Sequence, residues 1–69
     1  MTGRITQIIR GRSCGFIRTV DGQQVFFHAS DVDGLKFHQL EDRAAVRFTL
    51  VEDRLSGPRA TRVRIAGAS

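Results

Sequence analysis

The sequence predicts a single all-β domain, a five-stranded antiparallel barrel with one short helical turn after the third strand. Five short runs alternate between apolar and polar residues, and turn-forming residues separate them. The chain has 69 residues and 41% apolar content, which suits one folded core and leaves no room for a second domain. Because so small an open sheet would leave its edges unprotected, closure into a barrel is the favoured arrangement.

The first two predicted strands cover residues 4–10 and 14–19, and residues 11–13 form the turn between them. Successive side chains of a strand point to opposite faces of the sheet. The first strand therefore turns Ile5 and Ile9 toward one face, which we expect to be the inside of the barrel. In the second strand, the side chain of Ile17 points inward. The side chains that point outward are those of Cys14, Phe16 and Arg18.

The third predicted strand covers residues 23–28 and follows Asp21-Gly22, a strong hairpin signal because both residues tolerate positive φ. The second and third strands are therefore expected to be antiparallel neighbours. The inward side chains of the third strand are Val25 and Phe27. Its outward side chains are Phe26 and His28.

A single helical turn is expected after the third strand, with Ser30 as its cap and Gly34 as its end. A loop then continues to about residue 42.

The fourth and fifth predicted strands cover residues 44–52 and 58–65, with a turn over residues 53–57. Ala60 is out of phase with Val63, so a bulge is expected between them. The domain spans residues 1–69, with its folded part over residues 3–65 and a flexible tail over residues 66–69. The predicted core consists of Ile5, Ile9, Ile17, Val25, Phe27, Val32, Val46, Phe48, Leu50 and Val63.

The charge balance is basic, with a formal net charge of +4 and a sequence pI of about 11.1. Of the eleven basic residues, only Lys36 is a lysine. Arginine carries a planar guanidinium group that bridges phosphate oxygens and stacks on bases. A basic surface favours polyanionic partners, chiefly nucleic acid. The same basic composition is also compatible with an ordinary soluble surface that has no such partner.

The sequence also argues against several kinds of site. Cys14 is the single cysteine, so no internal disulfide forms, and with His28 and His38 it is too few for a structural zinc site. A membrane span needs about 18 consecutive apolar residues, and no apolar run in the sequence comes close to that length. Residues 1–4 lack the apolar core of a signal peptide. We therefore expect a cytoplasmic protein with no metal, cofactor, membrane or small-molecule partner.

One hairpin carries the functional signal. Phe16, Phe26 and His28 put three flat rings on the outer face of the second and third strands, where exposed apolar surface needs a reason. Stacking rings inside a cationic rim are the parts of a surface that binds single-stranded nucleic acid. The structural alternative is that Phe37, in the long loop, folds back and covers the rings. The expected rim consists of Arg4, Arg10, Arg12 and Arg18.

Three segments of the chain match family signatures. Residues 12–17 read Arg-Ser-Cys-Gly-Phe-Ile, residues 25–30 read Val-Phe-Phe-His-Ala-Ser, and residues 57–63 read Gly-Pro-Arg-Ala-Thr-Arg-Val. The first two resemble the ribonucleoprotein motifs of the cold-shock domain, Lys-Gly-Phe-Gly-Phe-Ile and Val-Phe-Val-His-Phe-Ser. The third resembles the late Gly-Pro-x-Ala-x-x-Val of the same family. The resemblance covers about residues 3–65 and implies an oligonucleotide-binding (OB) barrel.

The resemblance also implies the site residues. Bases would stack on Phe16, Phe26, His28 and Phe37. Among the arginines, Arg10 matches the basic residue that ends the family's first strand. From the residues themselves, we expect phosphates to be neutralised by Arg4, Arg10, Arg12, Arg18 and Arg62. The chain departs from the family pattern at Ser13, where the motif has glycine, and at Cys14 and Ala29, where it has aromatic residues. The family's Trp-Phe pair in the first strand is also absent, because the turn over residues 11–13 is shorter.

The remaining signals are weaker. His38 is interpreted as a solvated loop residue. Cys14, close to Arg12, is interpreted as a small residue tolerated on a strand rather than as a reactive thiol. The acidic residues around the long loop are interpreted as a solvated face. Alternatively, they repel phosphate and so keep it on the opposite side of the barrel. These residues are Asp31, Asp33, Glu41 and Asp42.

The leading hypothesis is a bacterial cold-shock-like protein that binds single-stranded RNA or DNA, and the resemblance implies RNA chaperoning or regulation of gene expression. The alternative is a protein-interaction or homodimerisation module on the same barrel. An enzyme is disfavoured, because a metal-dependent nuclease needs clustered carboxylates and the acids here lie on a loop. We expect a monomer, with a dimer as the alternative state.

Overall fold

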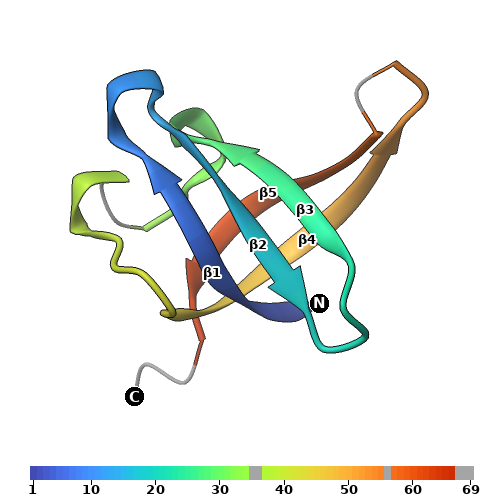
Figure 1. The fold of residues 1–69 in the computed structure, drawn as a ribbon, viewed down its shortest axis with the longest axis horizontal. Coiled ribbons are helices and arrows are strands. Elements are labelled where there is room, and N and C mark those ends of the chain that lie inside the picture. The colour runs from blue at the N-terminus through green and yellow to red at the C-terminus, as the bar shows by residue number, and fades with distance from the viewer. Residues whose placement is uncertain (35–36, 56, 67–69) are drawn as a thin grey trace.

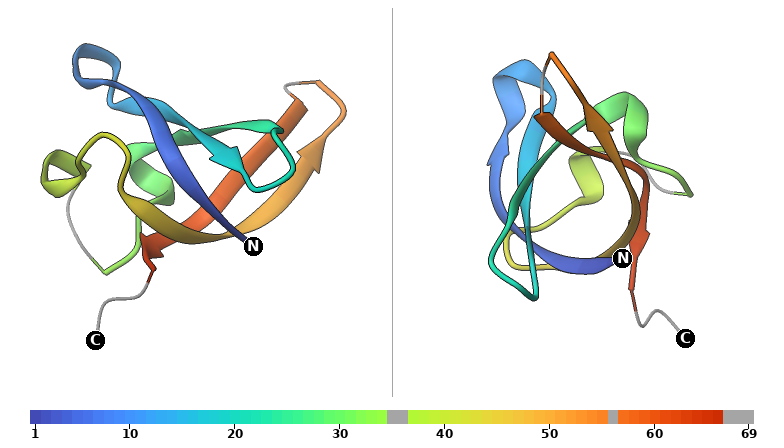
Figure 2. Two further views of the ribbon diagram at one scale, coloured as in Figure 1. Left: turned by 60° about the horizontal axis from the view of Figure 1, so that its bottom comes forward. Right: turned by 90° about the vertical axis from the view of Figure 1, so that its right-hand side faces the viewer.

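Five strands close into a barrel in the computed structural model, which describes residues 1–34, 37–55 and 57–66 (Figure 1). The strands are β1 (Thr2–Ile9), β2 (Cys14–Thr19), β3 (Gln24–His28), β4 (Ala45–Asp53) and β5 (Gly57–Ile65). They pair in the order β1-β2-β3-β5-β4, and β4 pairs with β1 to complete the ring, which the right-hand view of Figure 2 shows nearly end-on. The predicted all-β barrel is therefore confirmed.

Two details of the predicted architecture are corrected. The pairing between β3 and β5 is parallel, with Phe26 opposite Arg59. The chain forms β4 on the other side of β5 in the ring before β5 returns beside β3. The other strand pairs are antiparallel, as expected. Short 3₁₀ turns occur at three places in the described chain rather than at one, and they are η1 (Arg10–Arg12), η2 (Ala29–Asp31) and η3 (Phe37–Gln39).

A bulge in β1 changes which of its side chains face the core. The β1–β2 register shifts between Ile5 and Gln7, so Thr6 is an extra residue. One extra residue reverses the in-out alternation beyond it. Ile8 therefore packs against the core, and Ile9 is only half-buried. The prediction that Ile9 is a core residue is wrong, because a strict two-residue alternation gives no warning of a bulge.

A second bulge, in β5, confirms the expectation from the sequence. The β4–β5 register shifts between Arg47 and Thr49, and Arg62 adopts a left-handed φ of 52° at this point. Ala60 and Val63 are out of phase in the sequence, yet both are fully buried. The bulge reconciles the two positions, because it returns the strand to the inward phase.

The interior of the barrel holds Ile5, Ile17, Val25, Phe27, Leu40, Val46, Phe48, Ala60 and Val63. The other predicted core residues, Val32 and Leu50, are half-buried against this cluster. Leu40 was missed by strand periodicity because it lies in the loop after η3, where it is fully buried. The side chain of Arg10 donates a hydrogen bond to the Leu40 carbonyl at 3.2 Å, which ties this loop to the turn after β1.

The helical turn after β3 begins earlier than the sequence suggested. Its N-cap is His28 rather than Ser30. The Nδ1 atom of His28 accepts the backbone N–H of Ser30 at 3.2 Å, and the backbone N–H of His28 donates to the Asp31 carboxylate at 3.0 Å. These two reciprocal bonds form a capping box with His28 in the N-cap position.

The ends of the chain also differ from expectation. β1 begins at Thr2, because the Met1 amino group donates to the Phe48 carbonyl and the Phe48 N–H donates back to Met1, both at 2.9 Å. Ala66 is held by a hydrogen bond to Ala45, and the rest of the predicted flexible tail lies outside the described residues. Within the described residues, none of the helical segments is long and apolar enough to cross a membrane.

Candidate functional site

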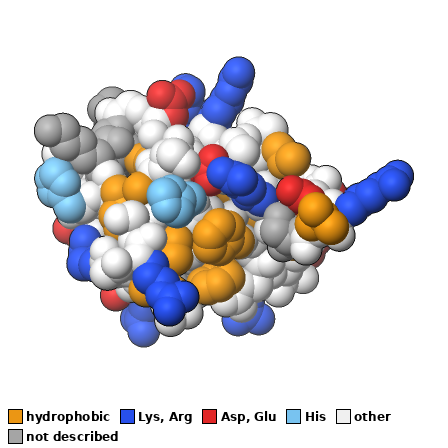
Figure 3. All heavy atoms as spheres, turned by 90° about the horizontal axis from the view of Figure 1, so that it is seen from above, with side chains coloured by type: hydrophobic (Ala, Val, Ile, Leu, Met, Phe, Trp, Pro, Cys, Tyr) orange, Lys and Arg blue, Asp and Glu red, His pale blue; other side chains and the backbone are white. Residues whose placement is uncertain are grey.

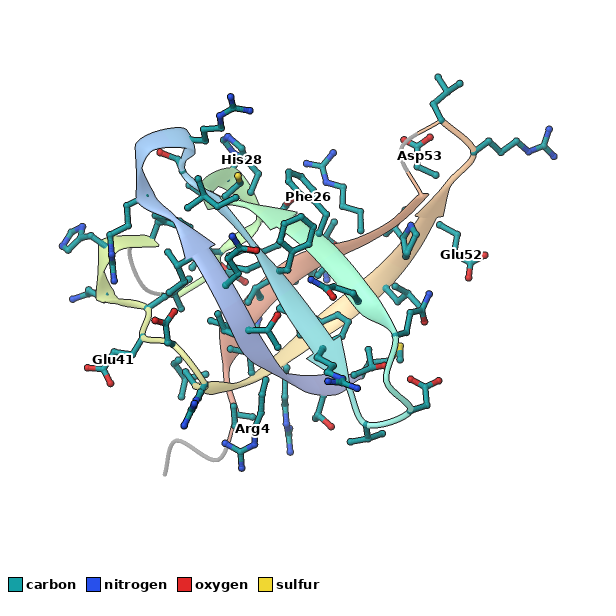
Figure 4. All side chains as sticks on the ribbon, in the orientation of Figure 1. Arg4, Phe26, His28, Glu41, Glu52 and Asp53 are labelled. Carbon is teal, nitrogen blue, oxygen red and sulfur yellow. The ribbon has the colours of Figure 1, made fainter. Side chains whose placement is uncertain are left out.

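The outer face of β2 and β3, with the adjoining part of β1, presents its side chains in cross-strand rows. Phe16 and Phe26 are directly opposite each other in one row, and Cys14 and His28 are opposite each other in the next. Figure 4 shows Phe26 and His28 on the same face, toward the η2 end of β3. We call Phe16, Phe26 and His28 the platform.

The two phenylalanine rings of the platform contact each other edge to face. Their centroids are 5.9 Å apart and their planes meet at 70°. Both residues are half-buried, and neither belongs to the core cluster. A T-shaped pair of this kind is favourable because the ring edge is positive and the ring face is negative. The contact restrains both rings while part of their surface remains exposed.

The sharp turn between β2 and β3 is fixed by local bonds. The Asp21 carboxylate accepts hydrogen bonds from the Thr19 hydroxyl and from the Gln23 amide. These bonds lower the pKa of Asp21, since they favour the charged form of the carboxyl group. Gly22 has a φ of 91°, which a residue without Cβ adopts freely. The turn thus fixes the register that sets Phe16 opposite Phe26.

Gly15, beside Phe16, has a steric role. A Cβ atom at this position would lie 2.5 Å from the Gln7 carbonyl oxygen and 2.9 Å from the Phe27 ring. A larger residue would therefore push β1 or the core ring away. The glycine lets β1 lie close to β2, which keeps Gln7 and Ile9 at the border of the platform.

Cys14 is less exposed than the sequence suggested. Its position is on the outer face between Ile9 and His28, but only 7% of the residue is accessible. The family motif has an aromatic residue here, so the chain replaces a ring with a small buried side chain. Ile9, which the bulge turns outward, supplies apolar surface next to it instead.

His28 is held by the capping box of η2. Its Nδ1 atom accepts the Ser30 amide and lies 3.3 Å from the Ser30 hydroxyl. With Nδ1 acting as acceptor, the neutral imidazole carries its proton on Nε2. The exposed ring therefore offers one fixed face and one hydrogen-bond donor.

Arg59 is a functional candidate that sequence reasoning missed. It lies on β5, opposite Phe26 across the parallel seam. Its Nε and Nη2 atoms donate to the two carboxylate oxygens of Asp31, both at 3.1 Å. This bidentate pair, with the attraction between the two charges, raises the pKa of Arg59. The guanidinium is thus oriented beside the platform, while 41% of the side chain stays accessible.

Of the four acidic residues around the long loop, Asp31 departs from the solvated face that the sequence suggested. The Asp31 side chain is only 9% accessible and binds Arg59. Asp33 pairs with Arg64 at 3.0 Å on the surface. Glu41 and Asp42 are exposed, as expected, and so is His38. No local sequence signal indicated the Asp31–Arg59 pair, because the partners belong to distant segments that meet only when the barrel closes.

Phe37 packs against the core rather than over the platform. Its ring centroid lies 6.2 Å from that of Phe27, and the residue is half-buried. Among the described residues, the ring contacts thus join Phe37 to Phe27 and Phe16 to Phe26. The cover that the sequence left open as an alternative is not formed, and the exposed part of Phe37 keeps it a candidate for stacking.

The predicted phosphate-binding arginines are spread around the platform rather than gathered at one edge. Arg4 and Arg18 face each other in the row next to Phe16, and Arg12 is exposed in η1. Arg10 is bound to the loop that carries Leu40. Arg62 lies at the β5 bulge, on the part of the barrel formed by β4 and β5.

The chemistry available at this face is stacking and charge. Figure 3 shows a central patch of hydrophobic side chains, with a histidine at its border and both basic and acidic side chains nearby. Among the described residues, no three His, Cys, Asp or Glu side chains are grouped as a metal ion would require. Exposed rings beside oriented guanidinium groups suit a ligand that has both flat bases and phosphates.

A comparison with protein families agrees with this geometry. The family model described as the 'Cold-shock' DNA-binding domain matches residues 1–66 of the 69-residue chain. The match includes all five strands and every residue of the platform.

Proposed function

The chain belongs to the cold-shock DNA-binding domain family, a family of nucleic-acid-binding domains, and from this premise we propose that it binds single-stranded nucleic acid on the platform. Bases stack on Phe16, Phe26 and His28, and Phe37 offers a further stacking surface. The observation that carries the proposal is the T-shaped pair of half-exposed rings on the outer face of β2 and β3. Its ring surface is open to a flat ligand, and paired bases in a duplex do not present such faces.

Phosphate binding in this proposal comes from arginine. Arg4, Arg10, Arg12 and Arg18 lie around the platform, and Arg62 is a more distant contributor. Arg59 is added to this set, because Asp31 holds its guanidinium beside Phe26. Neutralising about three to four phosphates would give a log–log salt slope of about −2 to −3 with a single strand.

The proposed biological role is that of an RNA chaperone or a regulator of gene expression. A platform that captures unpaired bases shifts the equilibrium of a weak hairpin toward its open form, because it binds one state only. The proposed action is binding alone, without catalysis, and it needs no metal or cofactor. RNA and DNA both present the bases and phosphates that this surface would recognise.

The test is a titration of fluorescent single strands and of duplexes of equal length. Phe26→Ala should weaken single-strand binding by about 1–3 kcal/mol. Leu55→Ala is the matched control, because it also removes apolar surface but lies in the β4–β5 turn, where Leu55 is 98% exposed. The control should bind as the parent does.

Two results would overturn the proposal. Tighter binding of duplex than of single strand would leave only a basic surface. Equal binding by Phe26→Ala and Leu55→Ala would remove the platform from the interface. If sedimentation then showed self-association that ignores oligonucleotide, the face would be a protein contact, the alternative that the sequence left open.

A further inference from the structure

Arginines continue from the platform around the end of the barrel where β1 begins. Arg18 is two residues from Phe16 on the same face of β2, which corresponds to about 6–7 Å along the strand. Arg4 is opposite Arg18 on β1, Arg43 lies in the turn before β4, and Arg47 of β4 is opposite Thr2. We call Arg4, Arg18, Arg43 and Arg47 the basic strip. Figure 4 shows Arg4 far from Phe26 and His28, toward the lower end of the barrel.

The basic strip places like charges in opposite positions of neighbouring strands, which does not stabilise the fold. Arg4 and Arg18 are directly opposite in the β1–β2 ladder, and Arg47 is directly opposite Arg64 in the β4–β5 ladder. Like charges in opposite positions of a sheet destabilise it. Arg64 is compensated by Asp33, but within the described chain none of the four strip residues forms an ion pair with a carboxylate. A bound anion would relieve this repulsion.

A groove runs along the same surface. Its volume is about 580 Å³, and Arg4, Arg18 and Arg43 all contribute to its lining. The other lining residues are neutral, and they include Thr6, Val20 and Ala45. Arg4 is fixed there by a hydrogen bond from its Nη1 atom to the Arg43 carbonyl at 3.1 Å. The carboxylate of the neighbouring turn, Asp21, is engaged by Thr19 and Gln23.

We propose that the basic strip and its groove bind the sugar-phosphate backbone of the strand beyond the bases that stack on the platform. The occupant follows from charge and continuity. The groove has three guanidinium groups and no acid in its lining, and Arg18 connects it to the platform through Phe16. Its contacts are with phosphates, so they are independent of base sequence. This inference rests on the proposed function and extends it by naming the path of the strand.

The test uses two fluorescent single strands, one of about 4 nucleotides that the platform alone accommodates and one of about 12. Arg43→Gln removes a charge at the groove and keeps the length of the side chain, and Arg54→Gln removes a charge in the β4–β5 turn. Arg43→Gln should leave the short strand unaffected and weaken the long one several-fold, with a salt slope smaller by about 0.7 in magnitude. Arg54→Gln is the control, and it should bind both the short and the long strand with the affinity of the parent chain.

A second variant protects the test from effects on folding. Arg43 has a φ of 67°, whereas Arg47 lies within β4 and outside that turn, so Arg47→Gln repeats the measurement without altering the turn. The inference is overturned if Arg43→Gln and Arg47→Gln weaken both strands equally or neither strand. If both variants weaken the long strand while Phe26→Ala weakens neither, the strip binds phosphate and the platform proposal fails instead.

Discussion

The β2–β3 and β4–β5 hairpins are similar inside the barrel and different outside it. Both fill the core, the first through Ile17, Val25 and Phe27, and the second through Val46, Phe48 and Ala60. Outside, β2–β3 presents the Phe16–Phe26 ring pair. The outward cross-strand pairs of β4–β5 are instead Arg47–Arg64, Thr49–Thr61 and Val51–Arg59.

The difference teaches that ring surface on an outer face is not a requirement of this barrel. The β4–β5 hairpin closes its side of the ring with small, aliphatic and charged residues. The β2–β3 hairpin keeps two half-exposed phenylalanines and an exposed histidine together, and the oriented Arg59 of β5 lies beside them. Stability therefore comes from the inner faces of both hairpins, and we propose that the outer face of one of them binds the ligand.

The largest expected effect is on the inner face of β3. Phe27→Ala removes a fully buried ring that contacts Phe37, so it should lower the free energy of unfolding by about 3–5 kcal/mol. A domain of this size has little stability to lose, and the variant should be largely unfolded at room temperature. Circular dichroism during thermal unfolding measures it. An unchanged melting temperature would contradict the division between inner and outer faces.

A smaller effect is expected at the seam between the two hairpins. Arg59→Lys keeps the charge but loses the planar fork that binds both oxygens of Asp31. Single-strand binding should weaken a few-fold, by about 1 kcal/mol or less, with an unchanged salt slope. Salt-resolved titrations measure both quantities. Binding that equals that of the parent would show that the orientation of this guanidinium is unimportant.

The smallest effect concerns the turn that leads into β2. Ser13 has a left-handed φ of 54° at the end of η1, at the position where the family motif has glycine. Glycine adopts this conformation without steric cost, so Ser13→Gly should raise the free energy of unfolding by up to about 1 kcal/mol. Affinity should stay constant, because the platform does not change. A destabilised variant would mean that the serine side chain contributes more than the backbone strain costs.

Much of the fold could be predicted because its signals are local. The Asp21-Gly22 turn fixed the pairing of β2 with β3, and the phase conflict between Ala60 and Val63 indicated the bulge that is found there. The bulge at Thr6 could not be foreseen, because Ile9 is in phase with Ile5 in a regular strand and is as apolar as Ile8, which the bulge turns inward instead. Leu40 was missed because its burial depends on how a loop closes the barrel end.

The candidate site divides in the same way. Phe16, Phe26 and His28 were assigned to one outer face by strand alternation and a hairpin, and the register places them there. Arg59 and its partner Asp31 come together only across the parallel seam, which neither segment encodes by itself. The burial of Cys14 was also unpredictable, since it depends on Ile9, whose outward position results from the β1 bulge.

The most direct test of the central claim is an NMR titration of the unmodified ¹⁵N-labelled chain with a short single-stranded oligonucleotide. Because stacked bases shift nearby amide signals, the largest changes should occur at Phe16, Phe26 and His28. The amides of Thr49 and Thr61, on the outer face of β4–β5, should remain in place. Changes at Thr49 and Thr61 with an unperturbed β2–β3 hairpin would contradict the account, because the ligand would then occupy the hairpin without rings.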